Sequence, residues 1–251
     1  MGTLEGKVAL ITGAGQGVGQ GIAFALSAEG AAIAVTGRTA SKLETTCKAI
    51  EQRGGRAIAI ACDVKSEESL CATVEETVAK LGTIDILVNN AQEVPLGSLE
   101  SVTDEAFAAG WESGPLATFR LMKLCHPHLK GGGVIVNLAS TAAKRWDMAN
   151  YGCYAAVKEA IRSLTRAAAC EWAVDGIRTN VILPHATSPA LAGWIDSRPE
   201  EAAAFFETIP MRRVGECEED IGAFVALLCS EGSRYVNGQS IAIDGGQAHM
   251  G

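Results

Sequence analysis

Tyr154 and Lys158 stand four residues apart in a stretch that reads Tyr-Ala-Ala-Val-Lys. On a helix, side chains at this spacing lie on the same face, so the phenol and the ammonium group would be neighbours. A phenol with its reference pKa near ~10 is a poor proton donor and acceptor at neutral pH, whereas a nearby positive charge favours the phenolate. The spacing therefore predicts a catalytic acid–base pair in which Lys158 acidifies Tyr154. Tyr151 is a competing phenol, but the residue four positions later is Ala155, which offers no charge.

Ser140 directly follows an apolar run at 134–139 that is typical of a β-strand. In α/β sheets the carboxyl ends of the strands form the ligand crevice, so we expect the Ser140 hydroxyl to polarise a carbonyl group there. Taken alone, a tyrosine and a lysine at this spacing are more often an exposed surface pair. The serine at a strand end and a glycine-rich turn upstream favour the catalytic interpretation.

The glycine-rich turn follows the first apolar run of the chain and leads into a helical pattern near 18–29. A strand, such a turn and a helix in this order are the context that a dinucleotide site requires. Gly13 permits the tight turn, Gly17 lets the backbone approach the pyrophosphate, and Gly19 allows close packing of helix and strand. The helix N-terminus offers free N–H groups and a partial positive charge to the phosphates. The residues of the turn expected to bind the dinucleotide are Gly13, Gln16, Gly17, Val18 and Gly19.

The second apolar run ends in Gly37 and Arg38. An acidic side chain here would bind the ribose 2′-hydroxyl and repel a 2′-phosphate, but Arg38 offers a planar fork to a phosphate. The sequence therefore favours NADP(H) over NAD(H), the alternative being that Arg38 is an ordinary solvated arginine at a helix start. After the third run, Asp63 is a candidate acceptor for the adenine amino group, and Val64 lies beside it.

Short apolar runs alternate with longer amphipathic or alanine-rich stretches along the whole chain. The predicted strands are 8–12, 32–36, 57–61, 84–89, 134–139, 178–183 and 240–243. The predicted helices lie near 18–29, 40–53, 67–80, 103–129, 152–174 and 217–230. Nearly continuous hydrophobic strands are expected where helices cover both faces of a sheet, so the order predicts an α/β, Rossmann-type, doubly wound parallel sheet. No linker or repeat divides the sequence, which predicts one domain over residues 1–251.

The segment 184–215 interrupts this alternation, because it runs for over thirty residues without a predicted strand. Insertions of this length are usually functional lids or disordered. Its apolar side chains could cover a ligand, which predicts a substrate-covering lid. These side chains are Trp194, Phe205, Phe206 and Ile209.

The charge balance excludes several classes of partner. With 21 basic and 29 acidic residues the net charge is −8, and there is no basic cluster, so neither a nucleic acid nor an anionic membrane surface is expected as a partner. No apolar stretch reaches the ~18 residues of a membrane span. The eight cysteines form no C-x-x-C pair, which favours reduced thiols in a cytoplasmic protein. His126 and His128 flank a proline and have no further ligand at suitable spacing, so no metal site is expected.

Together these residues resemble the short-chain dehydrogenase/reductase family, in its compact single-domain form, over nearly the whole chain. The matching motifs are the T-G-x-x-x-G-x-G turn at 12–19, the N-N-A segment at 89–91, Ser140, the Y-x-x-x-K motif at 154–158 and the ending at 236–246. Each motif alone is weak, but their combination in this order is specific.

The resemblance implies a seven-stranded sheet that binds a nicotinamide cofactor and a small-molecule carbonyl or alcohol substrate. Asn90, Ala91 and Pro184 would line the cofactor site, and Lys158 would hold the ribose hydroxyls. Tyr154 would exchange a proton with the substrate oxygen, which the Ser140 hydroxyl stabilises. The family also commonly forms homotetramers through long helices, so a tetramer or dimer is expected.

Three residues depart from the family pattern. Gln92 stands where N-N-A-G has glycine, and His185 stands where P-G has glycine; together with Trp194 they are candidate substrate contacts, the alternative being tolerated drift in loops. Gly114 stands where the family has an asparagine thought to hold a water of the proton relay. We hypothesise that a water near Ser113, or freed backbone carbonyls, serves the relay instead.

The leading functional hypothesis is an oxidoreductase that transfers a hydride between NADP(H) and a carbonyl or secondary alcohol. The alternative is a dinucleotide-binding sensor or scaffold with weak or no turnover, which the three departures motivate. A non-redox enzyme such as a dehalogenase is less favoured, because it would not need the glycine-rich turn. Ser188 is a weak candidate contact for the cofactor carboxamide, since the family's threonine aligns closer to Pro189.

Overall fold

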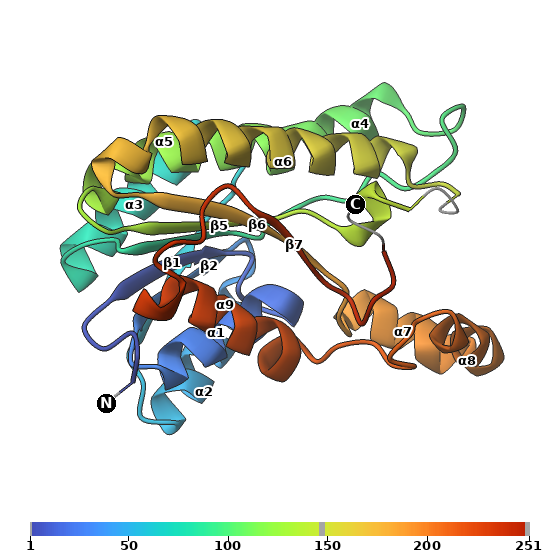
Figure 1. Cartoon of the computed structure of the whole chain (residues 1–251), viewed down its shortest axis with the longest axis horizontal. Helices are drawn as coiled ribbons and strands as arrows, with labels where there is room; N and C mark the ends of the chain where they lie inside the picture. The colour runs from blue at the N-terminus through green and yellow to red at the C-terminus, as the bar shows by residue number, and fades with distance from the viewer. Residues whose placement is uncertain (1, 146–148, 249–251) are drawn as a thin grey trace.

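Seven strands in the described part of the chain form one parallel sheet in the order β3-β2-β1-β4-β5-β6-β7 (Figure 1). This computed structural model describes residues 2–145 and 149–248, so the predicted span 1–251 includes residues 1, 146–148 and 249–251, which lie outside it. The strands are β1 (Val8–Thr12), β2 (Ala32–Gly37), β3 (Ala57–Ala61), β4 (Ile86–Asn89), β5 (Val134–Leu138), β6 (Arg178–Pro184) and β7 (Ser240–Ile243). Each neighbouring pair is parallel, which confirms the predicted doubly wound α/β architecture.

Helices cover both faces of the sheet. They are α1 (Gly17–Ala28), α2 (Ala40–Gln52), α3 (Glu67–Leu81), α4 (Asp104–Trp111), α5 (Ala117–Leu129), α6 (Gly152–Glu171), α7 (Pro189–Ser197), α8 (Pro199–Glu207) and α9 (Ala223–Cys229). Successive side chains of a strand point to opposite faces. Along β1, Ala9 and Ile11 pack with α1, α2 and α9, whereas Val8 and Leu10 pack with α3, α5 and α6. This two-sided burial explains why the strand sequences are continuously apolar.

The predicted helix at 103–129 is interrupted in the structure. A π-helical turn, Glu112–Leu116, separates α4 from α5 and contains Pro115. Proline has no N–H to donate and its ring crowds the carbonyl four residues earlier, so the chain widens by one residue per turn here. The helical direction nevertheless continues, so the effect of Gly114-Pro115 is a local bulge in the helix.

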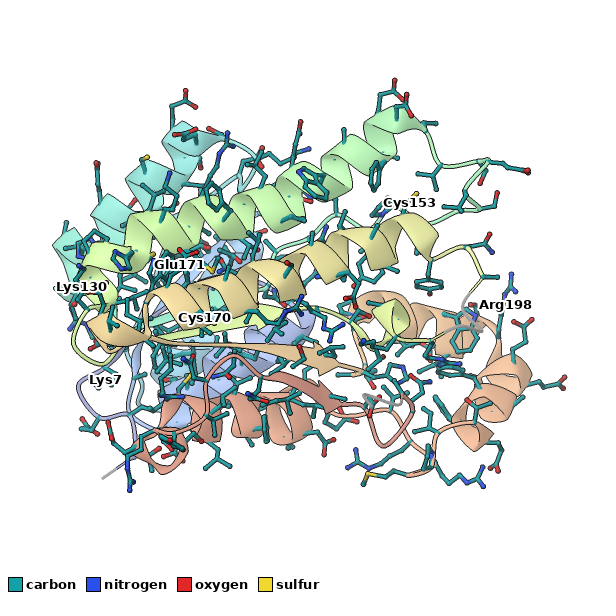
Figure 2. All side chains as sticks on the ribbon, turned by 45° about the horizontal axis from the view of Figure 1, so that its top comes forward. Lys7, Lys130, Cys153, Cys170, Glu171 and Arg198 are labelled. Carbon is teal, nitrogen blue, oxygen red and sulfur yellow. The ribbon has the colours of Figure 1, made fainter. Side chains whose placement is uncertain are left out.

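The segment 184–215 contains α7 and α8, which lie beyond the carboxyl ends of the strands (Figure 1). A single parallel bridge between Ala186 and Gly215 closes the segment at its base. Helix α6 runs along the sheet, so that Cys153 at its start lies toward Arg198, while Cys170 and Glu171 at its end lie on the side of Lys7 (Figure 2). The first turn of α6 therefore lies at the same end of the sheet as α7 and α8. Within the described residues, no helix combines the length and apolar character needed to cross a membrane.

Candidate active site

An open crevice of about 990 Å³ lies at the carboxyl ends of the strands. Residues that follow all seven strands line it, together with residues of α6, α7 and α8. The predicted site residues that line it are Gly13, Gln16, Gly17, Val18, Arg38, Asp63, Val64, Asn90, Ala91, Gln92, Ser140, Tyr154, Lys158, Pro184, His185 and Trp194. Gly19 is the predicted site residue that does not line the crevice.

The backbone of the glycine-rich turn takes conformations that require glycine. Gly13 has φ +65° and Gly17 has φ +59°, both in the left-handed region. A β-carbon on Gly19 would lie 2.4 Å from Nδ2 of Asn90 and 2.6 Å from the carbonyl oxygen of Gly13. The third glycine is therefore required by the approach of Asn90 to the turn, a more specific reason than the helix–strand packing expected from the sequence.

The N-terminus of α1 faces the crevice without a side-chain cap, because Gln16 at the N-cap position makes no capping hydrogen bond. Instead, its Oε1 accepts a hydrogen bond from Nζ of Lys42. The first N–H groups of a helix carry partial positive charge and bind anions. The uncapped N-terminus of α1 and the glycine-rich turn therefore fit the diphosphate of a dinucleotide, and the crevice is large enough to hold the rest of the molecule.

Asn90 holds the turn in place, with Thr12 as its partner. Oγ1 of Thr12 accepts hydrogen bonds from the N–H groups of Asn90 (2.9 Å) and Ala91 (3.0 Å). Nδ2 of Asn90 donates to the carbonyl oxygens of Thr12 (2.8 Å) and Gly13 (3.1 Å). The Asn90 side chain thus positions the turn, and Ala91 presents its surface to the crevice. The sequence analysis assigned Thr12 no role of its own, although its place in the turn motif was a usable signal.

The predicted reactive residues Ser140, Tyr154 and Lys158 come together. Nζ of Lys158 lies 5.5 Å from the centroid of the Tyr154 ring and donates a 2.8 Å hydrogen bond to the carbonyl oxygen of Leu138. Ser140 caps the short turn after β5, where its Oγ accepts from the N–H of Ala142 (3.2 Å). The lysine is thereby fixed to the end of the same strand that precedes the serine.

The charge states of this cluster differ from the expectation. Burial raises the pKa of Tyr154 to about 12, a hydrogen bond with the Ser140 side chain acts in the opposite direction, and Tyr151 raises it further. Burial lowers the pKa of Lys158 to about 7. Burial therefore opposes the predicted acidification of the phenol by the ammonium group, because it disfavours the charged form of both side chains.

The two departures Gln92 and Gly114 lie against each other. A β-carbon on Gly114 would lie 2.2 Å from Oε1 of Gln92. Nε2 of Gln92 donates to the carbonyl oxygens of Glu93 (2.7 Å) and Gly110 (2.8 Å), while its buried Oε1 has no hydrogen-bond partner among the described residues. The missing side chain at 114 thus provides the space that the larger side chain at 92 occupies.

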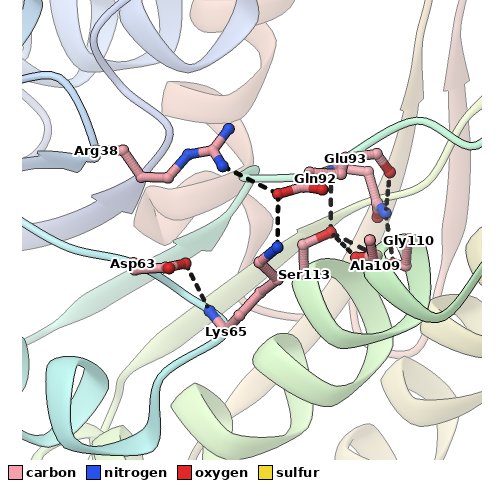
Figure 3. Close-up of polar contacts among 8 residues, drawn as sticks. All are labelled: Arg38, Asp63, Lys65, Gln92, Glu93, Ala109, Gly110 and Ser113. Carbon is pink, nitrogen blue, oxygen red and sulfur yellow. Dashed lines mark hydrogen bonds and ion pairs between the residues drawn. The ribbon is translucent and has the colours of Figure 1, made fainter. Parts of the chain in front are cut away.

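Ser113 is already engaged by its neighbours (Figure 3). Its Oγ accepts a 2.9 Å hydrogen bond from the N–H of Glu93 and donates a 2.7 Å bond to the carbonyl oxygen of Ala109. Its proton therefore goes to the helix backbone, and the role of Ser113 in a proton relay stays a prediction.

His185 and the aromatic residues of 184–215 form one wall of the crevice. The His185 ring lies 5.5 Å from that of Phe205, which lies 5.8 Å from that of Trp194. Phe206 and Ile209 do not line the crevice, and Ile209 is fully buried. Burial lowers the pKa of His185, and Arg145 lowers it further, whereas Asp244 acts in the opposite direction.

Several lining residues were missed by the sequence analysis. Arg145, Gln247 and Glu93 also line the crevice. Like Nδ1 of His185, Nε2 of Gln247 is a buried polar atom without a partner among the described residues. Ser188, a weak cofactor candidate, lines the crevice and caps α7 by accepting a 3.2 Å hydrogen bond from the N–H of Leu191. No spacing rule connects these positions to the motifs.

Comparisons with known proteins extend over nearly the whole chain. The family model described as Enoyl-(Acyl carrier protein) reductase matches residues 13–248. The chain is 38% identical over 255 residues to a 12α-hydroxysteroid dehydrogenase from Clostridium sp., which covers 98% of both chains. It is 34% identical over 253 residues to a 7α-hydroxysteroid dehydrogenase from Escherichia coli, covering 97% of this chain and 94% of that protein.

Two solved structures show the same agreement in three dimensions. One is a 7α-hydroxysteroid dehydrogenase complexed with NADH and 7-oxo glycochenodeoxycholic acid, with a TM-score of 0.91, 34% identity and coverage of 99% of this chain and 97% of that chain. The other is a blue fluorescent protein from a metagenomic library in complex with NADPH, with a TM-score of 0.90, 32% identity and coverage of 98% and 100%.

Proposed function

The chain belongs to the short-chain dehydrogenase/reductase family of oxidoreductases, and from that premise we propose that it transfers a hydride between NADP(H) and a carbonyl or secondary alcohol. The observation that carries the proposal is the convergence of Ser140, Tyr154 and Lys158 in a crevice that also contains the glycine-rich turn. When bound, the nicotinamide cofactor supplies the hydride chemistry, and the protein supplies binding and orientation.

The roles of the reactive residues follow from their surroundings. With its pKa raised to about 12, Tyr154 carries its proton at neutral pH and can donate it to a carbonyl oxygen as that oxygen gains negative charge. The hydroxyl of Ser140 stabilises the same oxygen. Lys158, whose pKa is near 7, gains or loses a proton easily at neutral pH and would hold the ribose hydroxyls.

The preference for NADP(H) rests on Arg38 at the end of β2. Its side chain is 64% exposed and lines the crevice, and no acidic residue follows β2 directly. A guanidinium group binds phosphate with two parallel hydrogen bonds, which a ribose 2′-hydroxyl cannot use. The two solved relatives contain NADH and NADPH respectively, so family membership alone leaves this choice to the residues of the site.

An extended, largely apolar substrate fits the remaining crevice. Trp194 and Phe205 supply an aromatic wall that His185 contacts, and buried polar atoms of His185 and Gln247 in the same crevice have no partner among the described residues. Because hydroxysteroid dehydrogenases are among the relatives, we favour a steroid ketone or alcohol as the substrate over a small ketone or alcohol. We propose that the segment 184–215 is the lid that covers this substrate.

The test is a panel of carbonyl substrates with NADPH, ranging from 7-oxo and 12-oxo bile acids to small ketones and aldehydes. We expect saturable turnover, with the oxo-steroids preferred. The second candidate, a dinucleotide sensor, is favoured by the changes at Gln92, Gly114 and His185. Tight NADPH binding without turnover of any substrate would support the sensor and contradict the proposed enzyme.

We also propose that the chain forms a homo-oligomer, with α4 and α5 in an interface. Phe107, Trp111 and Phe119 on these helices are 37%, 44% and 42% exposed, which is unusual for aromatic side chains on adjoining helices. Light scattering of the purified protein distinguishes a monomer, which would contradict this proposal, from a dimer or tetramer.

A further inference from the structure

Glu93 follows β4, and its carboxylate contacts two cations that follow other strands (Figure 3). Oε1 of Glu93 lies 3.0 Å from Nη1 of Arg38 and 3.1 Å from Nζ of Lys65. Arg38 follows β2 and Lys65 follows β3, whereas β1 and its glycine-rich turn lie between β2 and β4. The two ion pairs therefore reach across the end of β1, at the side of the crevice where Arg38 is expected to meet the cofactor.

Both cations share one carboxylate oxygen, and the three side chains differ in exposure. Glu93 and Lys65 are 32% and 30% exposed, whereas Arg38 is 64% exposed. Asp63 adds a second negative charge nearby, since its Oδ1 accepts a 3.1 Å hydrogen bond from the N–H of Lys65. These carboxylates therefore reduce the positive charge that Arg38 and Lys65 offer to an incoming anion.

The backbone of Glu93 is held in place. Its N–H donates to Oγ of Ser113 (2.9 Å), and its carbonyl oxygen accepts a 2.7 Å hydrogen bond from Nε2 of Gln92. The carboxylate can therefore release the cations by side-chain rotation, while the main chain keeps it within reach of them.

Resting on the proposed function, we infer that Glu93 tunes the choice between NADP(H) and NAD(H) by competing with a 2′-phosphate for Arg38 and Lys65. A phosphate and a carboxylate use the same donors of a guanidinium group. A 2′-phosphorylated nucleotide must therefore displace Glu93 or share Arg38 with it, whereas a nucleotide with a free 2′-hydroxyl leaves the ion pairs intact. Glu93 lowers the affinity for the first class and has little effect on the second.

The experiment uses two nucleotides that lack nicotinamide, adenosine 2′,5′-bisphosphate and adenosine 5′-monophosphate. Their dissociation constants are measured by titration calorimetry on the wild type, on Glu93→Gln and on Glu100→Gln, an exposed acidic residue of the same loop that makes no ion pair with Arg38 or Lys65. We expect Glu93→Gln to bind the bisphosphate roughly three- to tenfold more tightly, with a change below about twofold for the monophosphate. Glu100→Gln should match the wild type, and adding Arg38→Ala to Glu93→Gln should abolish the gain.

The outcomes separate the inference from the function it rests on. If Glu93→Gln leaves the ratio of the two dissociation constants unchanged, including by weakening both nucleotides equally, the role of Glu93 is overturned. Binding of the bisphosphate that depends on Arg38 would still support the cofactor preference. If the wild type binds neither nucleotide, the proposed function itself fails. Because neither probe carries a nicotinamide, catalytic turnover does not enter the result.

Discussion

The side chain of Gln92 occupies the position of a side chain at 114, since a β-carbon on Gly114 would lie 2.2 Å from Oε1 of Gln92. The two positions are 22 residues apart in the sequence. Gln92 is larger than the glycine of the family pattern, whereas Gly114 is smaller than the family's asparagine. Because the two residues are in contact, the volume lost at position 114 is filled by the side chain at position 92.

This exchange predicts that substitutions at the two positions are coupled. Gly114→Ala should lower the free energy of unfolding by about 1–3 kcal/mol, because the new methyl group overlaps the glutamine amide. In a Gln92→Ala background the same substitution should cost much less. Urea unfolding of the four proteins gives the coupling energy.

Gly193→Ala is the matched control, because a β-carbon on this helical glycine of α7 meets no described atom within 4 Å outside its chain neighbours and the backbone of its own helix. It should be neutral or stabilising, as expected for glycine replaced by alanine in a helix. Strictly additive effects of Gln92→Ala and Gly114→Ala would contradict the exchange.

The buried Lys158 predicts a pH-dependent stability. Its pKa is about 7 in the folded protein and returns to about 10.5 on unfolding, so between these values the unfolded chain binds the extra proton. The free energy of unfolding therefore rises with pH over this window, by at most about 1.4 kcal/mol per pH unit. The raised pKa of Tyr154 lowers stability only above pH 10, and the lowered pKa of His185 acts only below pH 6.5.

The measurement is urea unfolding at pH 7, 8 and 9. The wild type should gain stability relative to Lys158→Met as the pH rises, and the exposed-lysine control Lys80→Met should keep the wild-type slope. Parallel pH profiles for the wild type and Lys158→Met would show that Lys158 is not held neutral in the folded protein.

Arg38 predicts a selective loss of affinity for phosphorylated cofactor. Arg38→Ala should weaken NADPH binding about tenfold and NADH binding less than about twofold, because only the 2′-phosphate uses the guanidinium group. Fluorescence titration of both cofactors measures the ratio. Arg53→Ala, which removes an arginine paired with Glu218 away from the crevice, should leave the ratio unchanged. If Arg38→Ala lowered the affinity for NADPH and NADH equally, Arg38 would not determine the choice of cofactor.

The sequence alone predicted most of the strands and helices that position the site. Apolar runs located the strands with ends that agree to within two residues, because both faces of this sheet are buried and the runs are therefore continuous. The motif residues met in one crevice because the carboxyl ends of parallel strands share an edge. A serine after β5 and a tyrosine in the first turn of α6 could be paired on that ground alone.

What the sequence did not predict depends on distances between remote residues. Glu93 and Arg38 are 55 residues apart, and their ion pair follows from the path of the loop after β4, which no local pattern specifies. The sign of the pKa shift at Tyr154 was missed because burial, rather than the neighbouring lysine, dominates it. Burial of a side chain in a crevice is a property of the packed molecule.

The central claim is that Tyr154 delivers the proton during hydride transfer. It is tested most directly by the single-turnover rate of NADPH oxidation with a ketone that the wild type reduces, comparing Tyr154→Phe with Tyr151→Phe, the neighbouring phenol whose ring lies 6.2 Å away. We predict that Tyr154→Phe lowers this rate by at least about 10²-fold with NADPH affinity retained, whereas Tyr151→Phe keeps most of it. A Tyr154→Phe protein that oxidises NADPH as fast as the wild type would contradict the account.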